Sequence, residues 1–115
     1  MNLRDKILSQ PTPTMDKVHV KAWNVDVFIK PLTIKEHEEW ESLAFSKNGK
    51  RSENVSLKAS LVIACAHDES GTKIFTNDDI GSLSELYAEP INKLFAKCSE
   101  LNGLTDNDVK ELEGN

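Results

Sequence analysis

The sequence predicts a mainly helical α+β domain, in which an N-terminal β-hairpin packs against a bundle of about four to five helices. Two alternating segments between Val18 and Ile29 predict the hairpin. Apolar residues at spacings of three and four predict the helices, and the longest such run extends from Leu83 to Leu101. With 115 residues, 38% apolar and 29% charged, the chain has the size and composition of one globular domain, which we place at residues 15–103.

A short amphipathic segment precedes this domain. Leu3, Ile7 and Leu8 recur at helical spacing and predict about two turns of helix, followed by a stiff Pro-Thr-Pro-Thr spacer. A helix this short is marginal in water, so it has to dock on its own domain or on a neighbouring molecule. We expect residues 1–14 to form a flexible arm that supports self-association through its three apolar side chains.

The hairpin follows from period-two alternation, which places every second residue on one face. The residues predicted on the dry face are Val18, Val20, Ala22, Val25, Val27 and Ile29. Trp23 and Asn24 form the predicted turn, because asparagine tolerates a positive φ. Pro31 cannot donate to a sheet ladder and therefore ends the second strand.

The first helix of the domain begins at a capping box. Thr33 and Glu36 have the required spacing, which predicts a helix over residues 34–46 that ends at Asn48-Gly49. Its predicted buried stripe contains Ile34, His37, Trp40 or Glu41, and Leu43 or Ala44.

An apolar run at residues 57–66 predicts the central and most buried helix, of about thirteen residues. A polar turn over residues 67–72 and a brief extended segment to Phe75 follow. Thr76 and Asp79 repeat the capping-box spacing and predict a short helix.

Proline interrupts the strongest helical pattern of the chain. The apolar positions of this pattern are Leu83, Leu86, Tyr87, Ile91, Leu94, Phe95, Cys98 and Leu101. Pro90 lies within it and predicts either a kink or two abutting helices with the proline in the first turn of the second. Asn102-Gly103 ends the run, and Thr105 with Asp108 predicts a last short helix in a flexible acidic tail over residues 104–115.

Charge is distributed unequally. Residues 1–58 carry ten Lys and Arg against eight Asp and Glu, whereas residues 59–115 carry four against eleven. This acidic half argues against nucleic acid as a ligand, and the one basic cluster, at residues 47–51, is best interpreted as a solvated loop. No apolar run is long enough to span a membrane, so we expect a soluble cytoplasmic protein. Cys65 and Cys98 lie in apolar helical patterns, so we expect both to be buried free thiols.

Motifs of enzymes and cofactor sites are absent from the sequence. It contains no phosphate-binding glycine loop, nucleophile elbow or H-E-x-x-H motif, and the three histidines are scattered. Cys65 and His67 lack the paired spacing of zinc sites, and the acidic segments 77–79 and 106–108 lack the offsets of calcium loops. We therefore expect no enzyme, no cofactor and no metal.

Three aromatic residues are candidate partner contacts, because aromatic side chains dominate interface hot spots. They are Trp23, Trp40 and Tyr87. Core packing between hairpin and helix is the alternative for both tryptophans. Without catalytic machinery, a small sheet with amphipathic helices and mobile ends suits a binding module or a chaperone.

The order of these features resembles the tail assembly chaperones of long-tailed bacteriophages. The matching segments are Leu3-Arg4-Asp5-Lys6-Ile7, Val18-x-Val20-x-x-Trp23-x-Val25-x-Val27, Leu32-Thr33-x-x-Glu36, the segment 68–79 (DESGTKIFTNDD) and Leu101-Asn102. The family pattern commonly has glycine where this chain has Asn24, and either residue turns the chain.

The resemblance implies a late-expressed protein of the host bacterial cytoplasm that is absent from the mature virion. Such proteins bind the tape measure protein, keep its helices soluble and recruit the major tail protein, and a frameshifted longer form is common. The alternatives are a minor structural tail or head-tail connector protein, which purified particles would contain, and a host-directed regulator, which would have a defined host target.

Overall fold

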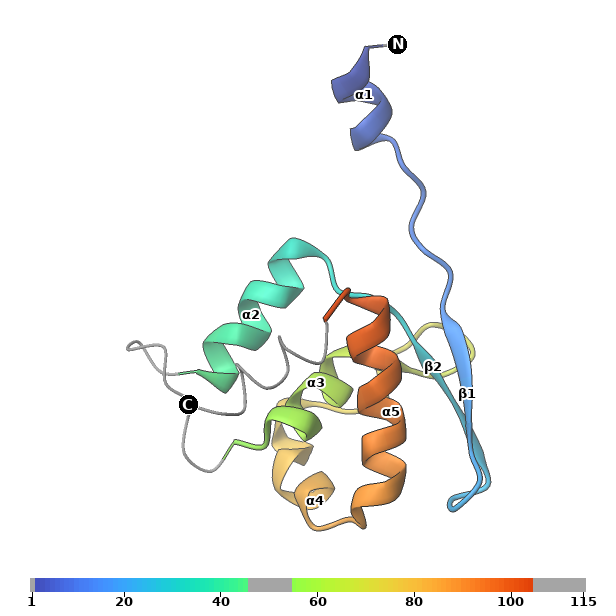
Figure 1. Ribbon diagram of the computed structural model, residues 1–115, viewed down its shortest axis with the longest axis vertical. Helices are drawn as coiled ribbons and strands as arrows, with labels where there is room; N and C mark the ends of the chain where they lie inside the picture. The colour runs from blue at the N-terminus through green and yellow to red at the C-terminus, as the bar shows by residue number, and fades with distance from the viewer. Residues whose placement is uncertain (1, 46–54, 105–115) are drawn as a thin grey trace.

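The computed structural model describes residues 2–45 and 55–104. Its elements are α1 (Leu3–Leu8), β1 (Asp16–Val20), β2 (Val25–Ile29), α2 (Ile34–Ala44), α3 (Leu57–Cys65), β3 (Ala66–His67), the 3-10 helix η1 (Asn77–Asp79), α4 (Ile80–Ser84) and α5 (Ala88–Leu101). Helix α5 lies between the sheet and α3, while α1 stands away from the body at one end (Figure 1). The predicted α+β fold, mainly α, is confirmed.

The sheet is antiparallel, with strand order β1-β2-β3. Val18 pairs with Val27, and both are buried together with Val20 and Ile29. The turn spans residues 21–24, so Ala22 lies in the turn rather than on the predicted dry face. Asn24 has the expected positive φ of 51°. Val25 is also exposed, at 45%, although its partner Val20 on β1 is buried.

Helix α2 begins at Ile34, as the capping box predicts. Thr33 Oγ1 accepts from the Glu36 amide at 3.2 Å, and Glu36 Oε1 accepts from the Thr33 amide at 2.9 Å. The helix ends at Ala44, two residues earlier than predicted, and the predicted stop at Asn48-Gly49 lies outside the described residues. Ile34 was wrongly placed on the buried stripe, since it is 80% exposed: it precedes the part of α2 that packs on α3.

Helix α3 is the most buried helix, as predicted, but has nine residues rather than about thirteen. The chain turns extended at Ala66 because Ala66 and His67 pair with β2 as a third strand. His67 therefore lies buried in the sheet and not in the polar turn, with its Nδ1 2.8 Å from the Cys65 carbonyl oxygen.

The apolar run from Leu83 to Leu101 forms two helices, with Pro90 in the first turn of α5. Proline is tolerated there because an amide in the first turn has no intrahelical acceptor. The connection over residues 85–87 turns Leu86 and Tyr87 outward, against their prediction as members of an apolar stripe.

Asn102 ties the end of α5 to the chain before α2. Its Oδ1 accepts from the Leu32 amide at 2.8 Å, and its Nδ2 donates to the Cys98 carbonyl oxygen at 2.8 Å. Gly103 then ends the helix with a φ of 71°. Cys65 and Cys98 are free and buried, as predicted. The helix predicted within residues 105–112 lies outside the described part of the chain.

Candidate partner-binding surfaces

The histidines form separate local contacts. His19 Nδ1 lies 2.8 Å from Asp26 Oδ1, and His37 Nδ1 lies 2.8 Å from Glu41 Oε1. Among the described residues, no group of three His, Cys, Asp or Glu side chains is placed to hold a metal ion. Nor does that part of the chain contain a helix with the length and apolarity to cross a membrane.

The Cys98 thiol is held in its protonated form. A hydrogen bond with the Cys65 side chain, together with burial, raises the pKa of the Cys98 thiol far above its ordinary value. A protonated, inaccessible thiol is a poor nucleophile. The arrangement therefore offers packing between α3 and α5 rather than reactivity.

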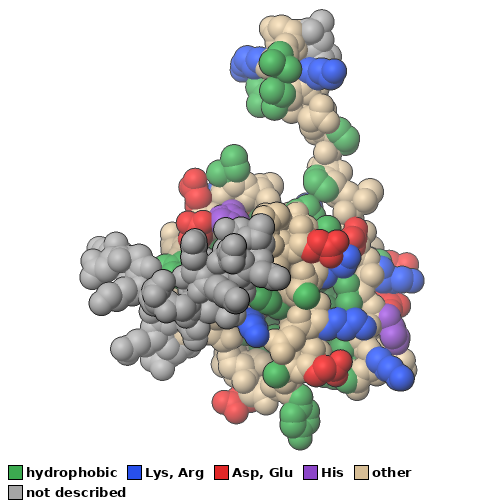
Figure 2. All heavy atoms as spheres, in the orientation of Figure 1, with side chains coloured by type: hydrophobic (Ala, Val, Ile, Leu, Met, Phe, Trp, Pro, Cys, Tyr) green, Lys and Arg blue, Asp and Glu red, His purple; other side chains and the backbone are tan. Residues whose placement is uncertain are grey.

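The arm exposes a full apolar face. Residues 2–14 are all exposed, and Leu3, Ile7 and Leu8 have exposed fractions of 59–73%. Asn2 caps the helix, since its Oδ1 accepts from the Asp5 amide at 2.8 Å. Figure 2 shows hydrophobic side chains gathered on this arm between Lys and Arg side chains. This helix is locally well formed but buries none of its own residues against the part of the chain that the structure describes.

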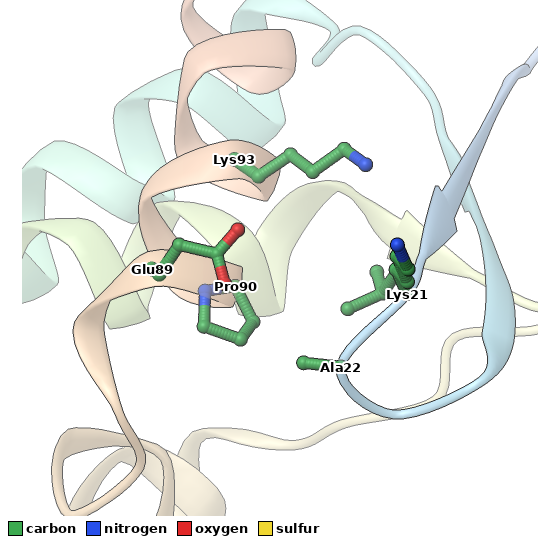
Figure 3. A pocket seen from close by; sticks show the side chains of 6 residues that line it. Lys21, Ala22, Glu89, Pro90 and Lys93 are labelled. Atoms are coloured by element: carbon green, nitrogen blue, oxygen red, sulfur yellow. The ribbon is translucent and has the colours of Figure 1, made fainter.

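A first hollow, here called the hairpin hollow, lies between the hairpin turn and the first turn of α5. It has a volume of about 380 Å³ and is lined by Val20, Lys21, Ala22, Glu89, Pro90 and Lys93. Pro90 and Ala22 face each other across it, and Lys93 extends from α5 toward β1 (Figure 3). Its floor is apolar and its rim carries charges of both signs.

Two lysines of α5 contact β1, one at the hairpin hollow and one at the start of the strand. Lys93 Nζ donates to the His19 carbonyl oxygen at 2.7 Å, and Lys97 Nζ lies 3.5 Å from Asp16 Oδ2. Lys97 also lies 3.3 Å from Glu100 Oε2, and the hydrogen bond and charge of Glu100 raise the pKa of Lys97 above its ordinary value. Both ammonium groups join α5 to β1.

A second hollow, here called the helix hollow, lies on the other side of the first turn of α5. It has a volume of about 200 Å³, and its lining includes Lys58, Ala59, Leu83, Leu86, Ala88 and Ile91. Lys58 borders it, with Nζ 2.9 Å from Asn92 Oδ1 and 5.8 Å from the centre of the Phe95 ring. Leu86 is 44% exposed at its edge, so this hollow presents apolar surface to solvent.

The aromatic candidates take three different positions. Trp40 is 3% exposed, and its Nε1 donates to Ser60 Oγ at 2.9 Å. It is therefore a core residue, which was the alternative to a partner contact. Trp23 is half-buried in the hairpin turn and packs against the core. Tyr87 is 90% exposed and directly precedes α5, between Leu86 and Ala88, which both line the helix hollow.

The residues that line the hollows were not predicted as a site. Ala22, Pro90 and Lys93 are ordinary in the sequence, and only folding brings the hairpin turn beside α5. One local signal was available: Pro90 indicates a helix start, and side chains just before a helix start face outward more often than those within a buried stripe.

Comparison with known proteins gives two findings. The family model described as phage tail assembly chaperone matches residues 2–115. Among solved structures, the bacteriophage HK97 tail assembly chaperone matches with a TM-score of 0.59 and 17% sequence identity, over 90% of this chain and 96% of that one. This likeness shows that the two chains share a fold. No curated protein sequence matches this chain.

Proposed function

The chain belongs to the phage tail assembly chaperone family, and on that premise we propose that it binds the tape measure protein and promotes assembly of the tail tube. The family match over residues 2–115 is the observation that carries this proposal. In this role the protein acts in the host bacterial cytoplasm, recruits the major tail protein, performs no catalysis and is absent from the mature virion.

The hairpin hollow is the surface that we propose for the tape measure protein. Long helices of such a protein present an apolar stripe flanked by charges, and a helix of this kind binds in an apolar groove. Val20, Ala22 and Pro90 supply an apolar floor, while Lys21 and Glu89 on the rim offer pairing to flanking charges of either sign. Its volume of about 380 Å³ exceeds the 200 Å³ of the helix hollow.

Two of the predicted aromatic contacts are close in sequence to residues that line this hollow. Trp23 belongs to the same turn as Ala22, and Tyr87 immediately precedes α5. An exposed tyrosine provides a large contact area for little loss of conformational entropy on binding. We therefore propose that Tyr87 contacts the bound helix at the edge of the hollow.

Co-expression with the tape measure protein tests the proposal. We expect this chain to move the tape measure protein into the soluble fraction. The variant Ala22→Glu, which places a carboxylate in the hairpin hollow, should abolish that effect, and Tyr87→Ser should reduce it. Ile34→Ser is the matched control, because Ile34 is an exposed apolar residue of α2 that lines neither hollow.

Two results would contradict the proposal. A tape measure protein that stays equally insoluble with and without the chain would exclude the chaperone function. Detection of the chain by mass spectrometry in purified particles, at a stoichiometry comparable with that of tail proteins, would favour a minor structural tail or head-tail connector protein instead.

A further inference from the structure

The start of α5 forms a ridge between the two hollows, which we define as residues 85–93. Its side chains divide between the two sides. The helix hollow receives Ala88, Ile91 and Asn92, and the hairpin hollow receives Glu89, Pro90 and Lys93. The hairpin turn forms the outer wall of the hairpin hollow, and α3 and α4 form that of the helix hollow. Figure 1 shows this order, with the start of α5 between α4 and the tip of the hairpin.

Unpaired lysines stand on the two outer walls. Lys21 belongs to the hairpin turn and Lys58 belongs to α3. Neither lysine makes an ion pair within residues 2–45 and 55–104. Lys58 Nζ donates instead to a neutral acceptor, Asn92 Oδ1, at 2.9 Å. Both ammonium groups can therefore pair with acidic side chains of a bound partner.

Unpaired glutamates lie on the ridge itself. Glu89 lines the hairpin hollow, and Glu85 directly precedes Leu86 at the edge of the helix hollow. Both glutamates are exposed, and neither makes an ion pair with another described residue. The cation on this side of the hairpin hollow, Lys93, already donates to a backbone carbonyl oxygen of β1 at 2.7 Å. Each hollow therefore has a positive outer wall and a negative inner border.

We infer that two amphipathic helical segments of the tape measure protein bind side by side, one in each hollow, with the ridge between them. A helix with its side chains is about 10–12 Å across, and packed helices lie about 8–10 Å apart, so a single helix lies on one side of the ridge only. Each segment presents an apolar stripe to its hollow, acidic residues to the lysine of the outer wall and basic residues to the glutamates of the ridge.

The inference rests on the proposed function and extends it, because it adds a second contact surface and specifies the charges that flank the bound helices. Tyr87, which is 90% exposed on the ridge, then lies between the two segments. Leu86 lines only the helix hollow. Leu86→Glu should nevertheless lower the amount of soluble tape measure protein on co-expression, as Ala22→Glu does in the hairpin hollow.

Titration calorimetry of the full chain with a synthetic peptide provides the test. The probe is a covalently stapled amphipathic helix with a leucine stripe, glutamates along one flank and lysines along the other. We expect two peptides to bind per chain. Ala22→Glu and Leu86→Glu should each reduce this stoichiometry to one, and the double variant should bind none. Ile34→Ser should keep two. All three positions are exposed, so circular dichroism should be unchanged.

A second probe joins two such helices by a flexible linker. It should bind once per chain and at least about tenfold more tightly than the single helix, because the second contact becomes intramolecular. Either hollow variant should return its affinity to that of the single helix. Glu85→Lys/Glu89→Lys should weaken binding roughly threefold, the range of exposed ion pairs. Glu38→Lys/Glu39→Lys makes the same charge change on α2 and should leave binding unchanged.

Three results would overturn the inference. One is a wild-type chain that binds one peptide or none, and another is the loss of all binding in Ala22→Glu alone. The third is a lower particle mass of Leu86→Glu in light scattering with unchanged peptide stoichiometry, because the helix hollow would then hold a second copy of this chain. The proposed function can fail separately. Two peptides per chain, together with a tape measure protein that stays insoluble, would exclude that function while supporting the surface for two helices.

Discussion

Helices α1 and α5 have the same kind of amphipathic pattern, but within residues 2–45 and 55–104 only α5 packs against other elements. Helix α5 buries Pro90, Ile91, Leu94, Phe95, Cys98 and Ser99 between α3 and the sheet, and α1 buries nothing. An apolar stripe therefore shows that a helix needs a partner surface without showing which molecule supplies it. Paired substitutions in the arm and the body test this difference directly.

The largest expected difference concerns apolar truncation. Leu94 of α5 is fully buried, so Leu94→Ala should lower the free energy of unfolding by about 2–5 kcal/mol through lost burial and a residual cavity. Ile7→Ala in α1 should change it by less than about 0.5 kcal/mol. Urea denaturation measures both, at a protein concentration where the chain is monomeric. Equal losses would show that α1 packs on its own domain.

Loss of a side-chain hydrogen bond should likewise lower the free energy of unfolding in the domain but not in the arm. Asn102→Ala leaves the half-buried Leu32 amide without its acceptor, and should cost about 1–3 kcal/mol of unfolding free energy. Gln10, whose Nε2 donates to the Lys6 carbonyl oxygen at 3.0 Å, is the matched position in the arm. Gln10→Ala should have no measurable effect. A loss below about 0.5 kcal/mol for Asn102→Ala, within the range of ordinary surface substitutions, would contradict the structural role of this residue.

Helix caps provide a third pair. Thr33→Ala removes the cap of α2 and should cost about 1 kcal/mol, because α2 unfolds together with the domain. Asn2→Ala removes the cap of α1 and should leave the unfolding free energy unchanged, although it should reduce helicity in the arm. Thermal unfolding followed by circular dichroism separates the two effects. A shift in the melting temperature with Asn2→Ala would count against an independent arm.

The smallest expected effect is a pH dependence in α2. The hydrogen bond from the Thr33 amide lowers the pKa of Glu36 below its ordinary value. A lowered folded-state pKa adds stability that is present above the unfolded value of 4.5 and is lost as the pH falls through the folded value. Glu36→Gln should therefore flatten the loss of stability below pH 5. Denaturation at a series of pH values measures this dependence. The same loss of unfolding free energy below pH 5 in Glu36→Gln and wild type would contradict the prediction.

Much of the fold was predictable because its signals are local. The capping box at Thr33, the positive φ at Asn24 and the helix start around Pro90 each depend on backbone contacts a few residues apart. Periodicity likewise identified Val18, Val27 and Leu94 as buried. The arm was predicted for the same reason, since a short apolar helix followed by a proline spacer is recognisable in one segment.

The candidate surfaces were predictable only in part. Tyr87 was selected as an aromatic contact and is exposed, but for a reason that the apolar pattern concealed: the connection before α5 turns it outward. Trp40 was selected on the same ground and lies in the core, bonded to Ser60. Both residues were selected because they are aromatic. Only their neighbours in the folded structure show that Tyr87 is exposed and Trp40 is buried.

The sequence by itself determined where α2 begins, the positive φ in the hairpin turn, the mainly helical α+β class and the presence of an exposed amphipathic arm. Hydrogen bonds and side-chain spacing within a few residues decide these features. Only the tertiary structure decided that Ala66 and His67 become a third strand, that Ile34 faces solvent, and that two hollows flank the first turn of α5. These depend on which distant segments pack together, because burial and surface shape belong to contacts between elements.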